Sequence, residues 1–351
     1  MYKKICFGII ASINLLNAGC GEQHCGCSND KLLKSEYELC NDCGISVSGS
    51  LLVWQPHVGG LDYVINNCRG TAFANSNAKV ERIDYKWTLG GRASIGYIFP
   101  EGMQVDLLWM GFFGKGSDSA KATTFGGLFP VWTIPGAGLT PAINAKASWK
   151  LDLNMLDLQL LGVFVPRSYL ELRPFIALSG EWINQRVDIN TCGGSSTQIA
   201  NANVIDDNID MKNKFYGIGP KVGIRTLWDI MCGFGIFGDF DVAIYYGRFD
   251  IKQYECVRLT GLNPAIIYLD IDSNRFNLST VNLDMAVGLR WDRMFCDDCY
   301  HVSFQVGWEN FVLLKQNKLM RFVTTSSPGI NVATNGDLTM QGVTIRAQFD
   351  F

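Results

Sequence analysis

The sequence predicts an all-β protein whose antiparallel strands close into a barrel that spans a membrane. Long runs alternate apolar with polar residues, and short and long connections follow each other in turn. After position 20 no apolar run approaches the roughly 18 residues that a spanning helix needs. Charged residues make up 18% of the chain, against about 25% in soluble domains. A strand-built membrane protein is therefore favoured over a helical one.

The N-terminus predicts a secretory signal. Lys3 and Lys4 supply a positive region, residues 5–16 are apolar, and Asn17-Ala18-Gly19 offers small residues for cleavage. Ala18-Gly19-Cys20 also resembles the end of a lipobox, although Asn17 stands where that motif has an aliphatic residue. Lipidation of Cys20 is therefore an open alternative.

Three domains follow from this start. We assign residues 1–19 to a signal peptide, 20–44 to a Cys-rich periplasmic segment, and 45–351 to the barrel. A secreted chain that spans a membrane with strands belongs in the bacterial outer membrane.

The last strand shows the alternation most plainly. Val343, Ile345 and Ala347 fall on one face with Phe349 and Phe351, while polar residues or glycine occupy the positions between them. Because successive side chains of a strand point to opposite faces, this strand has one apolar and one polar surface. Phe349 and Phe351 are typical of the terminal signal by which barrel-assembly machinery recognises such chains.

Similar runs divide the rest of the chain into ten predicted strands. Their approximate ranges are 45–55, 83–99, 103–113, 143–164, 169–189, 214–228, 233–249, 278–292, 300–315 and 338–351. Short connections alternate with long polar segments, which is the plan of short periplasmic turns and long extracellular loops. An even count places both ends in the periplasm. The long segments leave room for further hairpins, up to 16 strands.

One run changes phase. Trp149, Leu151 and Leu153 hold odd positions, whereas Leu156 and Leu158 hold even ones. One extra residue at Met155-Leu156 would explain the change, so we expect a β-bulge there. Pro174 and Pro220 predict local irregularity, because proline lacks the N–H that a ladder needs.

The polar faces are rich in charge. An Arg or Lys on the lipid face would cost about 2–4 kcal/mol at the midplane, so the charged face is expected to be the lumen. The predicted lumen-facing charges are Asp84, Lys86, Arg92, Asp152, Glu171, Arg173, Glu181, Lys221, Arg225, Asp284, Arg290, Glu309 and Arg346. They would set an ion preference, or pair with one another and fill a narrow barrel.

Aromatic residues near the strand ends predict two interfacial girdles. These residues are Tyr97, Trp109, Trp149, Trp182, Trp228, Trp291 and Trp308. A soluble β-sandwich would also have an apolar inner face, but it would have neither girdles nor a charged interior.

Nine segments in order carry a resemblance to a known family. They are residues 51–64, 90–109, 149–160, 170–185, 215–228, 245–249, 281–292, 300–310 and 338–351, from LLVWQPHVGGLDYV to LTMQGVTIRAQFDF. Together they resemble the Legionella-type major outer-membrane proteins and the MOMP-like porins of Chlamydia-related bacteria. Each motif is weakly specific alone, but their order along one chain is much more so. The resemblance implies a pore-forming outer-membrane barrel and leaves the solute open.

The chain has 12 cysteines, and Cys40–Cys43 and Cys296–Cys299 form C-x-x-C pairs. Such pairs suit zinc, redox exchange or a disulfide, and an oxidising periplasm favours disulfides. The Cys-rich segment 20–44 predicts cross-links to other envelope proteins. Cys68, Cys192 and Cys256 are expected in outer loops.

Enzymatic and nucleic-acid roles are not favoured. Among three histidines, only His57 with Asp62 offers an outer catalytic pair, and Gly59-Gly60 beside it indicates a turn instead. The net charge of −3 and the lack of a basic stripe argue against a nucleic-acid partner. We predict no cofactor and no metal. The expected partners are outer-membrane lipid, the assembly machinery, envelope proteins and, in one alternative, further copies of the chain.

Two functions stay open at this point. The first is a porin for passive diffusion of ions and small polar solutes. The second is a structural or adhesive envelope protein for which the barrel is an anchor. Strand number discriminates between them, because ten strands leave a lumen largely filled by side chains and about 16 leave an open channel.

Overall fold

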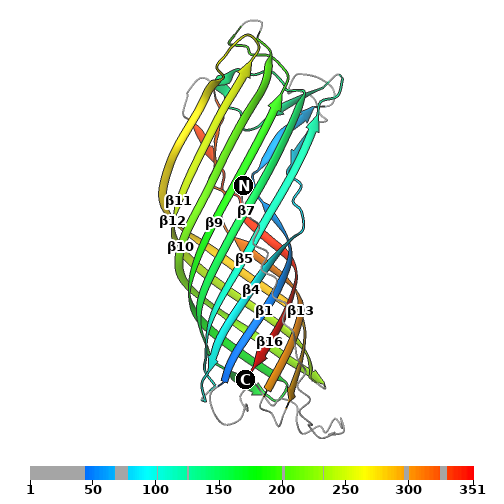
Figure 1. Ribbon diagram of the computed structural model, residues 1–351, viewed down its shortest axis with the longest axis vertical. Coiled ribbons are helices and arrows are strands. Elements are labelled where there is room, and N and C mark those ends of the chain that lie inside the picture. Colours follow the sequence, from blue (N-terminus) through cyan, green and yellow to red (C-terminus); the bar gives the residue numbers. More distant parts are fainter. Residues whose placement is uncertain are drawn as a thin grey trace, which may run out of the picture. The chain divides into compact units, whose positions relative to one another are not determined.

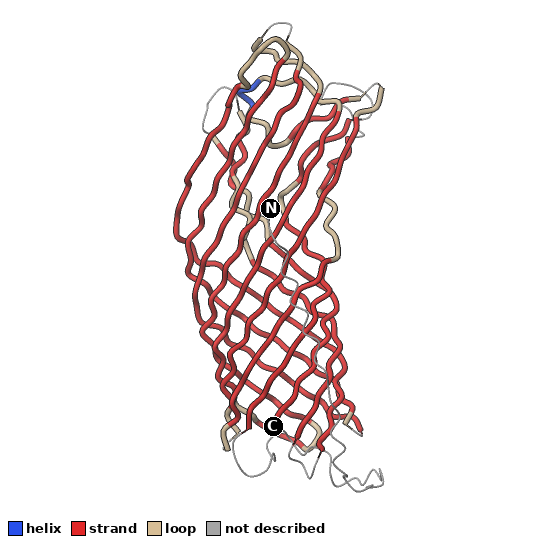
Figure 2. Tube along the Cα trace, viewed as in Figure 1, coloured by secondary structure: helices blue, strands red, loops and turns tan. Residues whose placement is uncertain are grey.

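A computed structural model describes residues 44–67, 78–100, 102–124, 126–199, 202–231, 233–295, 300–324 and 330–351. These residues belong to one compact unit, in which ten long antiparallel strands form a closed barrel (Figures 1 and 2). The sheet closes because β10 pairs with β11 on one side and with β9 on the other. The predicted count of ten is confirmed. No helix in these residues is long and apolar enough to cross a membrane.

The barrel strands, in chain order, are β1 Gly44–Val58, β4 Thr88–Ile98, β5 Gln104–Lys121, β7 Asn144–Leu161, β9 Leu170–Cys192, β10 Val204–Met231, β11 Phe234–Leu259, β12 Ile266–Phe295, β13 Tyr300–Leu313 and β16 Leu338–Asp350. Shorter elements connect them: β2 Asp62–Asn67, β3 Ala78–Arg82, β6 Gly127–Pro130, a 3-10 turn Pro135–Ala137, β8 Phe164–Arg167, β14 Met320–Phe322 and β15 Asn331–Ala333.

Both ends of the barrel chain lie at the short-turn end. The backbones of Ile45 and Phe351 exchange two hydrogen bonds, of 2.6 and 2.9 Å. Gly102 and Gly233 hold the short turns with φ of 79° and 77°, a left-handed conformation that suits glycine. This end corresponds to the periplasmic side of the predicted plan.

The strands differ in length by more than twofold. β4 has 11 residues and β16 has 13, whereas β10 has 28 and β12 has 30. About 9–11 residues suffice to cross a membrane. The long strands therefore project beyond it, and in Figure 1 they rise above the ends of β1 and β13. Much of what the sequence predicted as long loops is strand instead.

β7 shows what happens where a long strand leaves the membrane. Below Met155 its apolar residues Leu156 and Leu158 face outward, and the polar residues Asp157 and Gln159 are buried inside. Above Met155 the pattern is reversed: Trp149 is buried inside, and the polar residues between the apolar ones point outward. β7 pairs with β5 and β9 without any register shift. The predicted β-bulge at Met155-Leu156 is therefore wrong, because the surroundings change and the strand does not.

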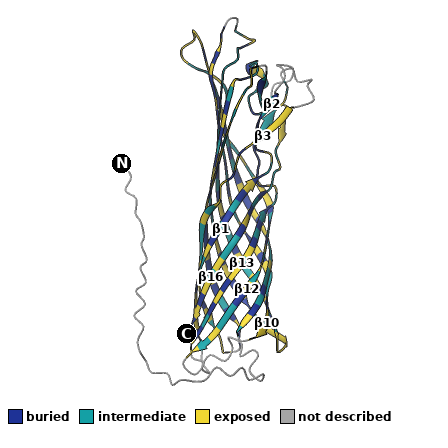
Figure 3. Ribbon diagram, turned by 90° about the vertical axis from the view of Figure 1, so that its right-hand side faces the viewer, coloured by how far each residue is buried: buried dark blue, intermediate teal, exposed yellow. Residues whose placement is uncertain are grey.

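Three neighbouring strands change at a similar level. At this level an outward aromatic residue is followed, one outward position further up, by a polar one: Trp182 in β9, Tyr216 in β10 and Tyr246 in β11 are these aromatic residues. Above this level the interior becomes an apolar core. Along the barrel strands, buried residues alternate with intermediate or exposed ones (Figure 3). Members of the core include Trp54, Phe112, Trp149, Ile183, Met211, Phe215, Tyr245, Phe249 and Ile251. Trp149, predicted as a girdle residue, belongs to this core.

Connecting segments enter the projecting half and fill it. Gln316 and Asn317 are buried, and Asn213 of β10 donates a hydrogen bond to the carbonyl of Gln316 at 2.7 Å. Gln253 of β11 exchanges two hydrogen bonds of 2.9 Å with the backbone of Met320. The outer half of the barrel is thus plugged by its own chain.

Other local expectations are corrected. The predicted strand 83–99 is shorter in the structure, because β4 begins only at Thr88 and the preceding Ile83 and Tyr85 are buried. The β10–β11 ladder skips Pro220, whereas Pro174 pairs with Ile224 in unbroken register.

The cysteines fall into two groups. Cys192 ends β9 and Cys256 lies within β11, so both are in strands rather than outer loops, and both thiols are free. The candidate disulfide residues Cys40, Cys43, Cys296 and Cys299, and also Cys68, lie outside the described residues.

Candidate functional site

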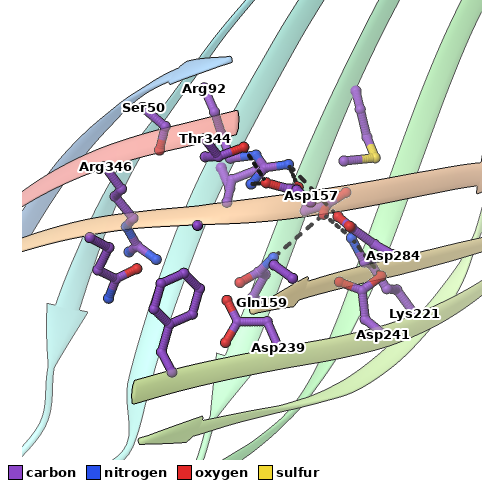
Figure 4. A pocket seen from close by; sticks show the side chains of 17 residues that line it. Ser50, Arg92, Asp157, Gln159, Lys221, Asp239, Asp241, Asp284, Thr344 and Arg346 are labelled. Atoms are coloured by element: carbon purple, nitrogen blue, oxygen red, sulfur yellow. Dashed lines mark hydrogen bonds and ion pairs between the residues drawn. The ribbon is translucent and has the colours of Figure 1, made fainter. Parts of the chain in front are cut away.

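The interior of the barrel at membrane level is packed with charged side chains from many strands (Figure 4). Arg92 of β4 pairs with Glu309 of β13 at 2.6 Å and with Asp284 of β12 at 3.7 Å. Thr344 of β16 donates a further hydrogen bond to Glu309 at 2.7 Å. This first group connects four strands across the lumen.

A second group is centred on Lys221 of β10. Its ammonium lies 3.1 Å from Asp157 of β7 and 3.2 Å from Asp241 of β11. Ser179 of β9 donates to Asp157 and also hydrogen-bonds the Tyr245 hydroxyl at 2.7 Å. Tyr245 is therefore the contact between the polar interior and the apolar core above it.

Acids outnumber bases at this level. Glu181 is fully buried, and neither of its carboxylate oxygens has a hydrogen-bond partner among the described residues. The acids here are Asp157, Glu181, Asp239, Asp241, Asp284 and Glu309, against the cations of Arg92, Lys221 and Arg346. Buried charge without compensation is unfavourable, so the excess acids call for a proton, water or a cation.

A third group occupies the lumen toward the turns. Arg225 donates to Gln159 at 2.6 Å, and Arg290 pairs with Asp292 at 2.6 Å. The imidazole of His301 lies between Asp350 and Asp292, with nitrogen–oxygen distances of 2.6 and 3.1 Å. Through Asp350 this group connects the last strand to the rest of the interior.

The space left between these groups is small. Two cavities of about 60 and 30 Å³ lie among them. A buried water needs at least about 10–15 Å³, so each cavity accommodates a few waters and excludes a sugar or an amino acid. No group of three or more metal-ligating side chains occurs in the part of the chain that the structure describes.

Most predicted lumen charges lie inside the barrel. These are Arg92, Glu171, Arg173, Glu181, Lys221, Arg225, Asp284, Arg290, Glu309 and Arg346. Asp84 and Lys86 instead lie exposed and pair with each other, and Asp152 faces outward, where it accepts a hydrogen bond from Asn154 at 2.8 Å. All three lie above the level where the faces exchange, so their polar face is the outer one.

Several uncharged members were missed. Ser179, Gln159 and Tyr245 are part of the network. Ser179 shares the inward parity of β9 with the predicted charges Glu171, Arg173 and Glu181, so parity could have identified it. Gln159 has the opposite parity to Asp152, the predicted charge on β7. Tyr245 reads as an apolar residue in the sequence and gives no such signal.

The catalytic alternative has no geometric support. The His57 ring packs edge-on against Tyr85, with centroids 5.2 Å apart. Asp62 pairs with Arg82 at 2.9 Å, and Gly60 forms the predicted turn with φ of 78°.

Two buried carboxyl groups lie near the outer end, well above the membrane level. Asp207 accepts a hydrogen bond from the Thr133 hydroxyl at 2.7 Å, and Glu255 accepts one from the backbone N–H of Ile134 at 2.8 Å. Burial raises the pKa of Glu255 to about 8, and repulsion from Asp207 adds to the shift. Burial likewise raises the pKa of Asp207, to about 6. They hold the connecting segment around Thr133 inside the barrel mouth.

The chain matches one known protein family over most of its length. Residues 40–351 match the family model described as the Legionella pneumophila major outer membrane protein precursor. A search of curated protein sequences found no match.

Three solved structures have a related outline. The Escherichia coli outer membrane protease OmpT is 13% identical, with a TM-score of 0.39 over 88% of this chain and 96% of that one. A major outer membrane protein of Thermus thermophilus is 11% identical, with a TM-score of 0.32 over 88% and 99%. The Pseudomonas putida toluene transporter TodX is 6% identical, with a TM-score of 0.31 over 91% and 92%. At these scores the likeness carries no argument about function.

Proposed function

Because this chain belongs to the family of the Legionella pneumophila major outer membrane protein, we propose that it forms a narrow pore that passes small ions across the membrane. The protein is located in the bacterial outer membrane, as the family description states. The observation that carries the proposal is the charged interior at membrane level, where carboxylates outnumber cations. Ionisable groups inside a membrane protein typically mark an ion path, and rings of carboxylates favour cations.

The width of the interior restricts the solute. Ten strands leave a lumen that side chains largely fill, and the enclosed cavities measure about 60 and 30 Å³. Water and small cations fit such spaces, whereas sugars and amino acids do not. The proposal is therefore narrower than passive diffusion of polar solutes in general.

Conduction also requires the outer half to open. The segment around Gln316 fills the projecting barrel, and hydrogen bonds from Asn213 and Gln253 hold it there. Its displacement is the step we expect to gate the pore. No catalytic step is part of the proposal.

Planar-bilayer conductance of the purified protein tests this function. We expect small, infrequent openings with cation preference, and a permeability ratio that falls toward unity in Asp241→Asn/Asp284→Asn. The matched control is Asp84→Asn, an exposed carboxyl on the outer surface, which should leave the ratio unchanged. Heat-modifiability on gels verifies that each variant folds. Absence of conductance above background would contradict the proposal.

A second function is favoured by the filled interior itself. In that case the barrel is an anchor, and the Cys-rich segment 20–44 cross-links the protein to envelope neighbours. Non-reducing gels of isolated envelopes separate the two functions. A ladder of high-mass species that collapses with reductant, together with absent conductance, would favour the anchor; monomer without reductant would exclude it.

A further inference from the structure

The outer wall of the barrel has cations directly above its aromatic girdle. On β5, Phe113 faces outward, and the next outward residue, further from the membrane, is Lys115. On β10 the outward Tyr216 has Lys214 in the same relation, and Tyr246 of β11 is followed by Arg248. Aromatic rings favour the membrane interface, and long basic side chains beside them reach the headgroups.

Cations also align across the strands. Lys115 of β5 pairs in register with Lys150 of β7, Lys150 with Arg186 of β9, and Arg186 with Lys212 of β10. Side chains directly opposite on adjacent strands have Cβ atoms about 4.5–5.5 Å apart, and like charges in such pairs are destabilising. Four cations in a row are therefore unfavourable unless an anion lies against them.

The protein supplies only part of that anion. Arg186 pairs with Asp188 at 2.9 Å and with Asp210 at 2.5 Å. The ammonium of Lys212 lies 3.9 Å from the same carboxylate, that of Asp210. Among the described residues, no carboxylate lies within 4.0 Å of Lys115, Lys150 or Lys214.

These side chains line one groove of about 1040 Å³. Its charged residues are five cations and one carboxylate, namely Lys115, Lys150, Arg186, Lys212, Lys214 and Asp152. The whole chain has a net charge of −3, so this concentration of positive charge opposes the overall balance. The groove is therefore a local basic surface.

The membrane side of the same groove is apolar. Trp87, Leu89 and Phe113 line it and are 51%, 64% and 58% exposed. An occupant that contacts both parts has a hydrocarbon portion next to an anionic group. Soluble anions match only the upper part.

From this arrangement we propose that the groove binds the phosphorylated headgroup of an anionic lipid in the outer leaflet. The lysines contact the phosphate oxygens, and the acyl chains lie along Leu89 and Phe113. The lipid supplies the missing counter-charge of the cation row. The proposal is independent of whether the lumen conducts.

The test uses the full chain reconstituted into vesicles of equal parts phosphatidylglycerol and phosphatidylcholine. After mild detergent extraction, native mass spectrometry counts the retained lipids. Basic residues near the membrane surface attract anionic headgroups. We expect about tenfold preference for phosphatidylglycerol in the wild type, and about twofold or less in Lys150→Gln/Lys212→Gln/Lys214→Gln, which removes three of the five cations of the groove.

Two further variants separate a bound lipid from general electrostatics. Lys79→Gln/Lys121→Gln/Lys146→Gln removes the same charge from exposed positions outside the groove and should retain the wild-type preference. Lys150→Arg/Lys212→Arg/Lys214→Arg should also retain it. Equal loss in the control and groove variants, or no preference in the wild type, would overturn the proposal. Heat-modifiability on gels verifies that every variant is folded.

Discussion

The two halves of this barrel use the same strands with opposite chemistry. At membrane level β7 presents Leu156, Leu158 and Leu160 to lipid and buries Asp157 and Gln159 inside. In the projecting half the same strand buries Trp149, Leu151 and Leu153 and shows polar residues outside. The backbone passes between the two without a register shift. The strand geometry provides two faces, and the surroundings of each face (lipid, water or interior) determine whether it carries apolar or polar side chains.

The two halves of the barrel are also stabilised by different interactions. In the projecting half, water surrounds the barrel and burial of apolar side chains stabilises it, as in a soluble protein. At membrane level the outer face is in hydrocarbon, so the interior is held by ion pairs and hydrogen bonds such as Arg92–Glu309. Substitutions of one kind should therefore change stability by different amounts in the two halves.

Removal of a large apolar side chain should have the greatest effect in the projecting core. Trp149 is fully buried, packs edge-on against Tyr85 with centroids 5.1 Å apart, and donates to Gln185 at 3.3 Å. Trp149→Ala should lower the free energy of unfolding by about 3–5 kcal/mol. Urea titration in detergent micelles measures this change. Trp308→Ala, at an exposed outward position, should have less than half the effect. An equal loss in both would mean that the projecting half has no core of its own.

A charge on the outer face should matter only at membrane level. Leu158→Arg places a cation against hydrocarbon and should destabilise the barrel by about 2–4 kcal/mol in a bilayer. Ser148→Arg on the outward face of the same strand should change stability by no more than about 0.5 kcal/mol. Folding into lipid vesicles under a urea series provides both values. Similar values for the two variants would place the membrane boundary elsewhere.

The smallest effect should be a pH-dependent loosening at the barrel mouth. The pKa values of Glu255 and Asp207 are raised by burial, to about 8 and about 6. An exposed carboxyl ionises at a lower pH, so the docked segment is favoured at acidic pH and loses stability as the pH rises toward about 8. Hydrogen exchange at Ile134, corrected for the intrinsic rate, should therefore accelerate from about pH 5, just above the pKa of an exposed carboxyl, to about pH 9.

Glu255→Gln provides the control for this effect, because its side chain cannot ionise. It should remove most of the acceleration and leave the membrane half unchanged. Acceleration that persists in Glu255→Gln would assign the loosening to another group.

The sequence was most informative where a strand has one environment. Residues 343–350 of β16 lie in the membrane half, so their alternation predicts which face each side chain occupies, whereas Leu338 and Met340 at the other end of the strand belong to the projecting core. β7 crosses the membrane boundary, and its phase change was misread as a β-bulge. The sequence does not show where the membrane ends, so an extra residue was the simplest explanation for the change. Asp84, Lys86 and Asp152 were misplaced for the same reason.

The contacts inside the barrel were not accessible from the pattern. Parity places Arg92 and Glu309 on inward faces, but these residues are 217 positions apart, and their meeting depends on strand tilt and register. The plug around Gln316 was also missed, because polar segments between strands are expected to be exposed loops.

Labelling from the lipid phase tests the inversion most directly. A lipid-soluble carbene reagent, activated in vesicles that contain the folded protein, modifies side chains that face hydrocarbon, and mass spectrometry locates them. On β7 we predict labels on Leu156, Leu158 and Leu160 and none on the outward residues from Lys146 to Asn154. Labels that continue above Asn154 on the outward face, or that appear on Trp149 and Leu151, would contradict the exchange of faces at Met155.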